Sequence, residues 1–245
     1  MKLFKEIFAR IWAVWGIVSF IGTFLIVFIP SMCTYLVPDP KSAKIFSRIA
    51  KYWMDVWLFL VACPLKVKGK ENFLPGKTYV VICNHNSLMD IPISSPYIPG
   101  ANKTIAKTSF AKIPLFGFYY SKGSVLVDRK SEASRKASYT KMKEVLAMGI
   151  HMCIYPEGTR NKSNLLLNKF HNGAFKLAEE TNTPIIPGII FHTRKVMPAN
   201  KAFYLLPHRL EFHFLPAIHP DLPTEALKEK AHQVMLQYLE VHAKD

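Results

Sequence analysis

The sequence contains few of the residues that build disulfide frameworks or metal sites. Its 245 residues include only four cysteines, Cys33, Cys63, Cys83 and Cys153, and no two of them form a Cys-x-x-Cys pair. Cys33 and Cys63 lie inside apolar segments, a pattern typical of free thiols in a reducing compartment. Apart from His85, the histidines show no ligand cluster, so we expect no metal ion.

Acidic residues are also scarce, since 17 Asp and Glu stand against 32 Lys and Arg, for a formal net charge of +15. Such an excess attracts polyanions, among which nucleic acids and anionic membranes are the obvious candidates. The sequence has no zinc-finger spacing, no RNP-like aromatic motif and no long basic helix, so we do not expect nucleic acid as a partner. Basic residues beside a hydrophobic anchor favour membrane lipids instead.

Charge is absent from the 28 residues between Ile11 and Pro38, which is more than the roughly 20 residues that a helix needs to cross a bilayer. Neither the length of this run nor its flanks match a cleavable signal peptide. Gly16, Gly22 and Pro30 weaken the prediction of one uninterrupted helix. A second apolar stretch, Tyr52–Leu65, is short for a span and is more typical of an interfacial or buried helix.

Lysine and arginine flank the first apolar segment on both sides, so the positive-inside rule gives no clear orientation. This distribution favours two helices that enter one leaflet and return, and a single true span is the alternative. We therefore predict membrane-anchoring helices over residues 1–63 and a separate domain over 64–245. The protein is expected to be membrane-bound, on the cytoplasmic face of the cytoplasmic membrane.

Beyond residue 64, short β-rich runs alternate with helical patterns. Helices are predicted over Glu132–Met148, with Ser131 as its cap and Gly149 at its end, and over Thr224–His242. The predicted strands are Leu65–Val67, Tyr79–Cys83, Thr104–Ala106, Val125–Asp128, Met152–Tyr155, Ile185–Phe191 and Leu210–Leu215. This alternation predicts an α/β fold, with a mixed sheet flanked by helices.

The first group of polar residues, Asn84-His85-Asn86-Ser87-Leu88-Met89-Asp90, directly follows a predicted strand. On a continuous helix His85 and Asp90 would lie about 140° apart. We therefore place His85 in the strand-to-helix turn and Asp90 in the first helical turn, reaching back to the imidazole. A carboxylate on one ring nitrogen fixes the tautomer and makes the other nitrogen a better base. Taken alone, a pair at this spacing is more often structural.

Two further strands end in charged turns. Arg129 follows the strand that ends near Asp128, and its guanidinium suits a phosphate, although a solvated turn is the alternative. The turn Pro156–Arg160 carries Glu157, which could hold a substrate hydroxyl, and Arg160, which could hold a phosphate. A fourth segment, Thr183–Gly188, resembles a buried strand with prolines at its start or edge.

Together and in this order, the four segments resemble the motifs of the glycerolipid acyltransferase family. The matching positions are Asn84, His85 and Asp90 in the first, Gly123, Asp128 and Arg129 in the second, Pro156 to Arg160 in the third, and Pro184, Ile185 and Pro187 in the fourth. Tyr155 replaces the family's phenylalanine, and Lys107 with the run Ile113–Gly117 also fits the pattern. Where members often have Phe-Lys-x-Gly, this chain has Phe170-His171-Asn172-Gly173, so Lys169 or Lys176 is the expected substitute.

The resemblance implies the glycerolipid acyltransferase fold with an N-terminal hydrophobic anchor, residues 64–245 being the catalytic domain. It implies transfer of an acyl group from acyl-CoA or acyl-ACP to the sn-2 hydroxyl of 1-acylglycerol-3-phosphate, giving phosphatidic acid without a further cofactor. His85 would be the general base and Asp90 its partner. The remaining roles are phosphate binding by Arg129 and Arg160, a glycerol pocket shaped by Glu157, Gly158 and Thr159, and an acyl pocket or structural support from Pro184 and Pro187.

Other functions stay open at this point. The acceptor could be another lysolipid, such as a lyso-ornithine lipid, or glycerol 3-phosphate. A protein of another class, a non-catalytic lipid-binding membrane protein, would not need the His85–Asp90 pair. Ser87 is not surrounded by a Gly-x-Ser-x-Gly elbow, which argues against a serine hydrolase. Both donors, acyl carrier protein and the coenzyme A thioester, are acidic partners that a +15 chain attracts.

Overall fold

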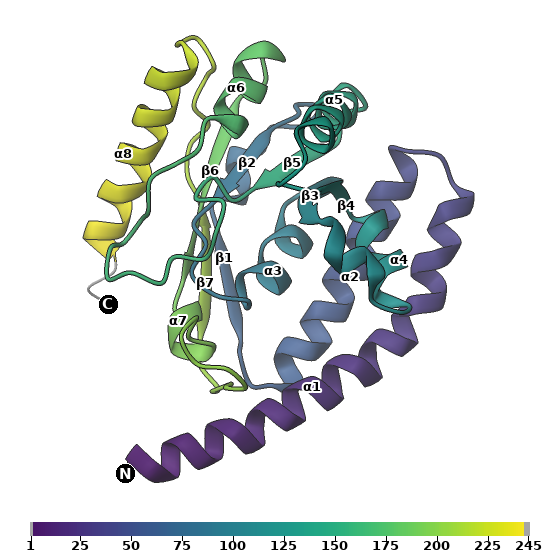
Figure 1. Cartoon of the computed structure of the whole chain (residues 1–245), viewed down its shortest axis with the longest axis vertical. Helices are drawn as coiled ribbons and strands as arrows, with labels where there is room; N and C mark the ends of the chain where they lie inside the picture. The colour runs from purple at the N-terminus through teal and green to yellow at the C-terminus, as the bar shows by residue number, and fades with distance from the viewer. Residues whose placement is uncertain (1, 243–245) are drawn as a thin grey trace.

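Seven strands form one mixed sheet in the computed structural model, which describes residues 2–242 (Figure 1). The strand order is β1-β7-β6-β2-β5-β3-β4. The strands β6, β2, β5, β3 and β4 run parallel, β7 is antiparallel to β6, and β1 is parallel to β7. Their bounds are β1 Leu65–Lys68, β2 Val80–Cys83, β3 Asn102–Lys107, β4 Ser124–Val127, β5 His151–Ile154, β6 Ile185–Phe191 and β7 Leu210–Phe214. All seven predicted strands are present, and the predicted mixed sheet is confirmed.

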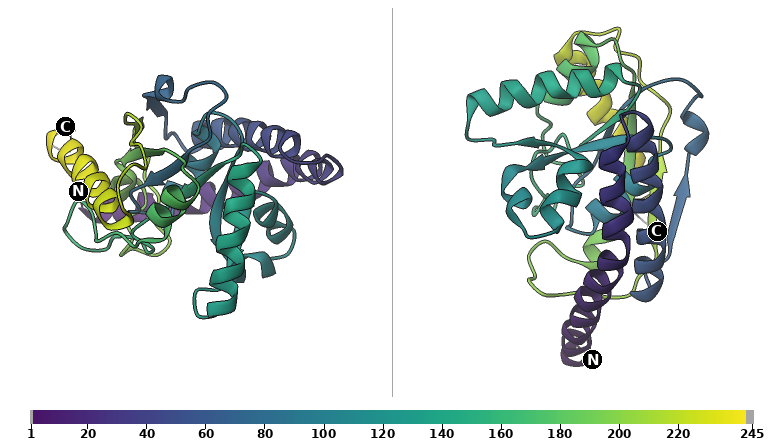
Figure 2. Two further views of the ribbon diagram at one scale, coloured as in Figure 1. Left: turned by 90° about the horizontal axis from the view of Figure 1, so that it is seen from above. Right: turned by 90° about the vertical axis from the view of Figure 1, so that its right-hand side faces the viewer.

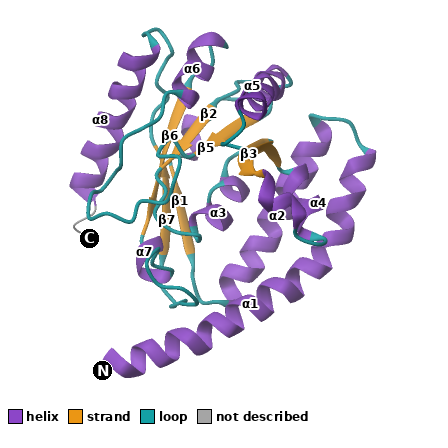
Figure 3. Cartoon of the chain, viewed as in Figure 1, coloured by secondary structure: helices purple, strands orange, loops and turns teal. Residues whose placement is uncertain are grey.

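Helices cover both faces of the sheet (Figure 3). One face packs against α5 (Glu132–Ala147), α6 (Gly173–Glu180) and α8 (Thr224–His242). The other face packs against α2 (Lys41–Leu60), α3 (Asp90–Ile93) and α4 (Phe116–Lys122), while α7 (Thr193–Val196) follows β6. The predicted start of α5 is confirmed, because Ser131 Oγ accepts a hydrogen bond of 3.2 Å from Ser134 N.

The burial of each strand follows its sequence. The central strands β2 and β6 are apolar throughout and every residue in them is buried, as expected where helices cover both faces of a parallel sheet. The edge strand β1, with sequence Leu-Lys-Val-Lys, alternates half-buried apolar and exposed basic side chains. The most hydrophobic strands therefore lie at the centre of the sheet, which places the turns that follow them next to one another.

The N-terminal region forms a helical hairpin of α1 (Lys2–Cys33) and α2, joined through a short 3-10 turn (Figure 2). α1 is one continuous helix that includes Gly16, Gly22 and Pro30. The expectation that these three residues disfavour an uninterrupted helix is therefore wrong. Gly16 is a contact point, because its carbonyl accepts a 3.0 Å hydrogen bond from Trp57 Nε1, and a Cβ here would lie 2.5 Å from Leu205. Pro30 lies one turn before the end of the helix, so the hydrogen bond that it cannot donate to the Ile26 carbonyl is one of the last in α1.

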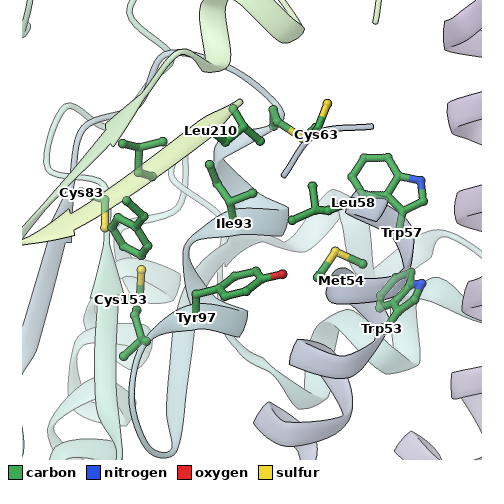
Figure 4. Packing of buried hydrophobic residues seen from close by; sticks show 14 of the residues in the cluster. Trp53, Met54, Trp57, Leu58, Cys63, Cys83, Ile93, Tyr97, Cys153 and Leu210 are labelled. Atoms are coloured by element: carbon green, nitrogen blue, oxygen red, sulfur yellow. The ribbon is translucent and has the colours of Figure 1, made fainter. Parts of the chain in front are cut away.

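The hairpin and the sheet share one hydrophobic core. Trp53, Met54, Trp57 and Leu58 of α2 pack in the same cluster as residues from the sheet side, among them Cys83, Ile93, Tyr97, Cys153 and Leu210 (Figure 4). The division into units at residue 63 stays a prediction, and the two predicted units are in contact through this core.

The outer surface of α1 is strongly apolar. It is the one helix among the described residues that is long and apolar enough to cross a membrane, with a mean hydropathy of 2.2 over its most apolar window. Its exposed large side chains include Leu3, Phe4, Ile11, Val18, Ile26 and Ile29. A contiguous apolar surface of this kind marks a membrane or protein contact, so the structure agrees with an N-terminal membrane anchor.

Candidate active site

The candidate site lies at the edge of the sheet where the carboxyl ends of neighbouring parallel strands meet. β2 leads to His85, β5 leads to Tyr155 and the turn that carries Arg160, and β4 leads to Arg129. Because β2 and β5 are paired, the first and third sequence motifs are brought side by side. A cavity of about 340 Å³ opens here, and His85, Arg129 and Arg160 all line it.

His85 and Asp90 are paired as predicted. His85 Nδ1 lies 2.9 Å from Asp90 Oδ2, and Asp90 is the first residue of α3. An ionised carboxylate only accepts hydrogen bonds, so Nδ1 carries the proton and Nε2 is left as the basic nitrogen. The His85 side chain is 14% exposed and lines the cavity, whereas Asp90 is fully buried. An imidazole held in this way by a buried carboxylate has the geometry that a general base requires.

Asp90 is itself held rigidly. Its Oδ2 also accepts hydrogen bonds from the backbone N–H groups of Asn86, at 2.6 Å, and Ser87, at 2.7 Å. Its Oδ1 is buried without a hydrogen-bond partner in the described part of the chain. A buried carboxylate with one unsatisfied oxygen is costly, and the three hydrogen bonds to Oδ2 offset part of that cost. They fix Asp90 in place as the hydrogen-bond partner of His85.

The ring of Tyr155 fixes the plane of the imidazole. The two rings are stacked, with centroids 4.2 Å apart and an interplanar angle of 22°. The Tyr155 hydroxyl, which the family's phenylalanine lacks, shares a 2.7 Å hydrogen bond with Ser94 Oγ. The substitution at this position therefore adds a polar contact behind the base without changing the stacked ring.

Glu157 occupies a different place from the one expected. Its carboxylate is buried, and Oε1 accepts from His85 N at 2.7 Å while Oε2 accepts from Asn168 N at 3.0 Å. Burial raises the pKa of this carboxyl above its ordinary value, and the two backbone hydrogen bonds oppose that rise. Glu157 does not line the cavity, so a direct contact with a substrate hydroxyl is not what the structure shows. It anchors the backbone of the base instead.

The cavity is strongly cationic. Arg129 and Arg160 line it as expected, together with Lys107 and Lys162, and within residues 2–242 no carboxylate lines it. Gly158 and Thr159 also line it, and the Gly158 carbonyl accepts a hydrogen bond from Arg129 Nη1. Converging guanidinium and ammonium groups are the donors that bind phosphate in proteins.

Some expected site residues lie elsewhere. Lys169 and Lys176 do not line the cavity, and Lys176 faces Glu180 at 3.6 Å, so Lys107 and Lys162 supply the additional positive charge. Pro184 and Pro187 do not line it either. The Pro184 carbonyl accepts from Val80 N at 3.0 Å and the Pro187 carbonyl from Leu215 N at 2.8 Å. These hydrogen bonds are compatible with structural support, and the role of both prolines in the site stays a prediction.

Three features of the site are not evident from the sequence. Lys162 lies outside the four motifs, and nothing in its neighbourhood marks it as a cavity residue. Arg194, which contacts the turn after His85, is more than 100 positions away from that turn. Ser87 Oγ donates to the carbonyl of Met197 at 2.6 Å, which accounts for this serine as a structural residue.

A larger cavity of about 730 Å³ adjoins the first and lies between α1 and residues 197–205. The two cavities share the lining residues Leu88, Arg160 and Lys162, so they lie next to each other. Ala13, Gly16 and Phe20 of α1 contribute to its wall, together with Trp57. A cationic cavity next to a mostly apolar one, beside the anchor helix, is suited to an anionic lipid.

Comparison with known proteins agrees with this geometry. The chain is 27% identical to the 1-acyl-sn-glycerol-3-phosphate acyltransferase of Chlamydomonas reinhardtii over 91% of its own length and 69% of that protein. It is 31% identical to the chloroplastic enzyme of that name from Arabidopsis thaliana, over 66% of this chain and 46% of the plant protein. The chain thus spans about half of the plant protein.

The fold has a close counterpart among solved structures. The crystal structure of the 1-acyl-sn-glycerophosphate acyltransferase PlsC from Thermotoga maritima matches with a TM-score of 0.79 and 22% sequence identity, covering 98% of this chain and 97% of that one. The match includes the N-terminal helices as well as the sheet. The family model described as Acyltransferase matches residues 64–191, which is more than half of the chain and contains His85, Asp90, Arg129 and Arg160. The protein therefore belongs to the acyltransferase family.

Proposed function

We propose that this acyltransferase transfers a fatty acyl group to the sn-2 hydroxyl of 1-acylglycerol-3-phosphate, forming phosphatidic acid. The observation that carries the proposal is a carboxylate-paired imidazole in a cavity whose charged lining is entirely cationic among the described residues. The imidazole is placed to remove the proton of a hydroxyl, and the cations are placed to bind a phosphate on the same molecule. The two 1-acyl-sn-glycerol-3-phosphate acyltransferases that the chain resembles support this acceptor.

The reaction follows from the pair. His85 Nε2 accepts the proton of the acceptor hydroxyl while its oxygen attacks the carbonyl carbon of the acyl thioester. Asp90 stabilises the resulting imidazolium. The tetrahedral intermediate collapses with cleavage of the C–S bond, and the imidazolium returns its proton to the departing thiolate. The nucleophile is the substrate itself, so no acyl-enzyme forms and no further cofactor is consumed.

The acyl donor is an acidic thioester, either acyl-CoA or acyl-ACP. The phosphates of coenzyme A and the acidic surface of an acyl carrier protein are both attracted by the formal charge of +15. Parallel assays with the two donors, at equal acyl-chain length, distinguish them: the physiological donor gives the higher kcat/KM, and its advantage shrinks as salt is added.

Arg160 is expected to bind the phosphate of the acceptor, because it lines both the cationic cavity and the apolar one. Arg160→Ala should lower kcat/KM for lysophosphatidic acid by roughly 10–100-fold, the effect of losing a charged hydrogen bond. The loss should be much smaller for an acceptor without phosphate, such as monoacylglycerol. Arg209→Ala, at a 59% exposed side chain just before β7, is the matched control.

Equal losses of kcat/KM for the two acceptors would show that Arg160 does not bind the phosphate. If the wild type prefers a phosphate-free acceptor, such as a lyso-ornithine lipid, the acceptor assignment is wrong while acyl transfer stands. Preference for glycerol 3-phosphate over its acylated form would show that the apolar cavity does not hold the acceptor's chain.

We propose further that the hairpin of α1 and α2 enters one leaflet and returns, with the sheet on the cytoplasmic face. The start of α1 and the end of α2 lie on the same side, since Trp12 Nε1 donates to Val61 O at 3.0 Å and Trp15 Nε1 to Leu60 O at 2.8 Å. Exposed apolar side chains continue beside α1, at Phe118 and Phe203. A site beside the anchor receives its lipid acceptor laterally from that leaflet.

Cys33 provides a test of this topology, because it ends α1 and is the one exposed cysteine of the four. In sealed vesicles, a membrane-impermeant maleimide should leave Cys33 unlabelled from either side, since a re-entrant hairpin keeps the exposed face of this end of α1 against lipid. Detergent should restore labelling. A cysteine introduced at Glu229, exposed on α8, should be labelled only from the cytoplasmic side. Labelling of Cys33 from the opposite side would show that α1 spans the membrane.

A further inference from the structure

The segment after β6 lies outside the four motifs and outside the matched family model, yet it contacts the base's own turn. In α7, Arg194 donates to Asn86 Oδ1 through both Nε, at 3.1 Å, and Nη2, at 2.8 Å. Asn86 is the residue next to His85, and its backbone N–H donates to Asp90. The guanidinium is therefore one side chain away from the carboxylate that orients the base.

The same guanidinium also holds the turn that supplies phosphate-binding cations. Arg194 Nη1 donates to the carbonyl of Ser163 at 3.1 Å, and Nη2 lies within 3.3 Å of the Asn161 carbonyl and 3.4 Å of the Leu165 carbonyl. These residues continue directly from Arg160 and enclose Lys162. One planar group thus connects the loop of the base with the loop of the cations.

Two other hydrogen bonds also join these loops, from Asn161 N to the His85 carbonyl at 2.6 Å and from His85 N to Glu157 Oε1 at 2.7 Å. Without Arg194, the Asn86 side chain and the three carbonyls lose a shared, charged donor, and water would have to replace it. Arginine suits this task because its fork presents several donors in fixed directions, whereas lysine offers a single ammonium on a flexible stem.

We propose that Arg194 is a positioning residue that holds the phosphate-binding loop in register with the catalytic base. It does not line the cavity of the base, so it acts through Asn86 and the loop carbonyls and not by contact with the reacting atoms. Binding of the acceptor phosphate at Arg160 and Lys162 then places the sn-2 hydroxyl at His85, because the two loops keep one relative position. The inference rests on the proposed acyl transfer to lysophosphatidic acid.

The test compares Arg194→Ala and Arg194→Lys with the wild type in acyl transfer to lysophosphatidic acid. We expect Arg194→Ala to lower kcat about 10-fold or more and also to raise KM for the acceptor. Arg194→Lys should recover little, since it restores the charge but not the fork. Added guanidinium ion should partly rescue Arg194→Ala and leave the wild type unaffected. Lys195→Ala, the exposed neighbour, is the control.

A readout that does not use activity accompanies these rates. Backbone amides of residues 161–166 should exchange hydrogen for deuterium faster in Arg194→Ala than in the wild type, with the sheet unchanged. A folded Arg194→Ala with unaltered kcat, KM and exchange would overturn the inference. So would a loss of rate that Lys restores in full. An inactive wild type would instead count against the proposed reaction, while the exchange result would still report on the connection between the loops.

Discussion

Replacing His85 with alanine is expected to lower turnover by roughly 10²–10⁴-fold, the contribution that a positioned general base makes. The imidazole is held by a buried carboxylate, and it lines the space that we propose the acceptor enters. The effect should fall on kcat more than on KM, because the cations that bind the phosphate are untouched. Initial rates with saturating acceptor measure it directly.

The loss must be separated from misfolding. The His85 side chain is partly exposed in the cavity, and its backbone contacts to Glu157 and Asn161 do not depend on the imidazole, so the variant should fold. The same unfolding midpoint as the wild type, together with the same elution from a sizing column in detergent, establishes this. A folded His85→Ala that retains most of the wild-type rate would show that another group takes the proton.

The second large effect is expected at Asp90. Asp90→Asn keeps the shape of the side chain and an oxygen for the N–H groups of Asn86 and Ser87, but it removes the negative charge beside the imidazole. The imidazolium that forms during transfer then lies next to a neutral amide, and the amide NH₂ can favour the wrong tautomer of His85. We expect a loss in kcat of about 10²-fold or more.

Glu144→Gln is the matched control for Asp90→Asn, since it makes the same carboxylate-to-amide change at an exposed side chain of α5. It should leave kcat unchanged. If Asp90→Asn is folded and retains near-normal kcat, the carboxylate contributes structure alone, and His85 works without charge stabilisation from it.

The strands could be predicted because their sequences are short, apolar and bounded by turn residues. β2 and β6 are both continuous apolar runs, which in an α/β protein indicates central strands. The continuity of α1 was not predictable in the same way. Gly16 and Pro30 disfavour a helix on local grounds, and it is the packing of α1 against Trp57 and Leu205 that maintains the helix at Gly16.

In the site, the parts that could be predicted are local in sequence. The spacing of His85 and Asp90 fits one strand-to-helix turn, so this short motif by itself determines how the two side chains meet. The place of Glu157 could not be read from its motif, because it depends on the pairing of β2 with β5, which brings the His85 N–H next to the carboxylate. The contact of Arg194 with Asn86 depends on β6 lying beside β2, and the sequence of neither segment contains a pattern that indicates it.

The most direct test of the proposed reaction is acyl transfer to lysophosphatidic acid in detergent, with labelled acyl-CoA and labelled acyl-ACP as donors, for the wild type and for His85→Ala. We expect labelled phosphatidic acid from the wild type with at least one donor, and a rate lower by roughly 10²-fold or more from the variant. A folded wild type that forms no product with either donor would contradict the assignment of lysophosphatidic acid as the acceptor.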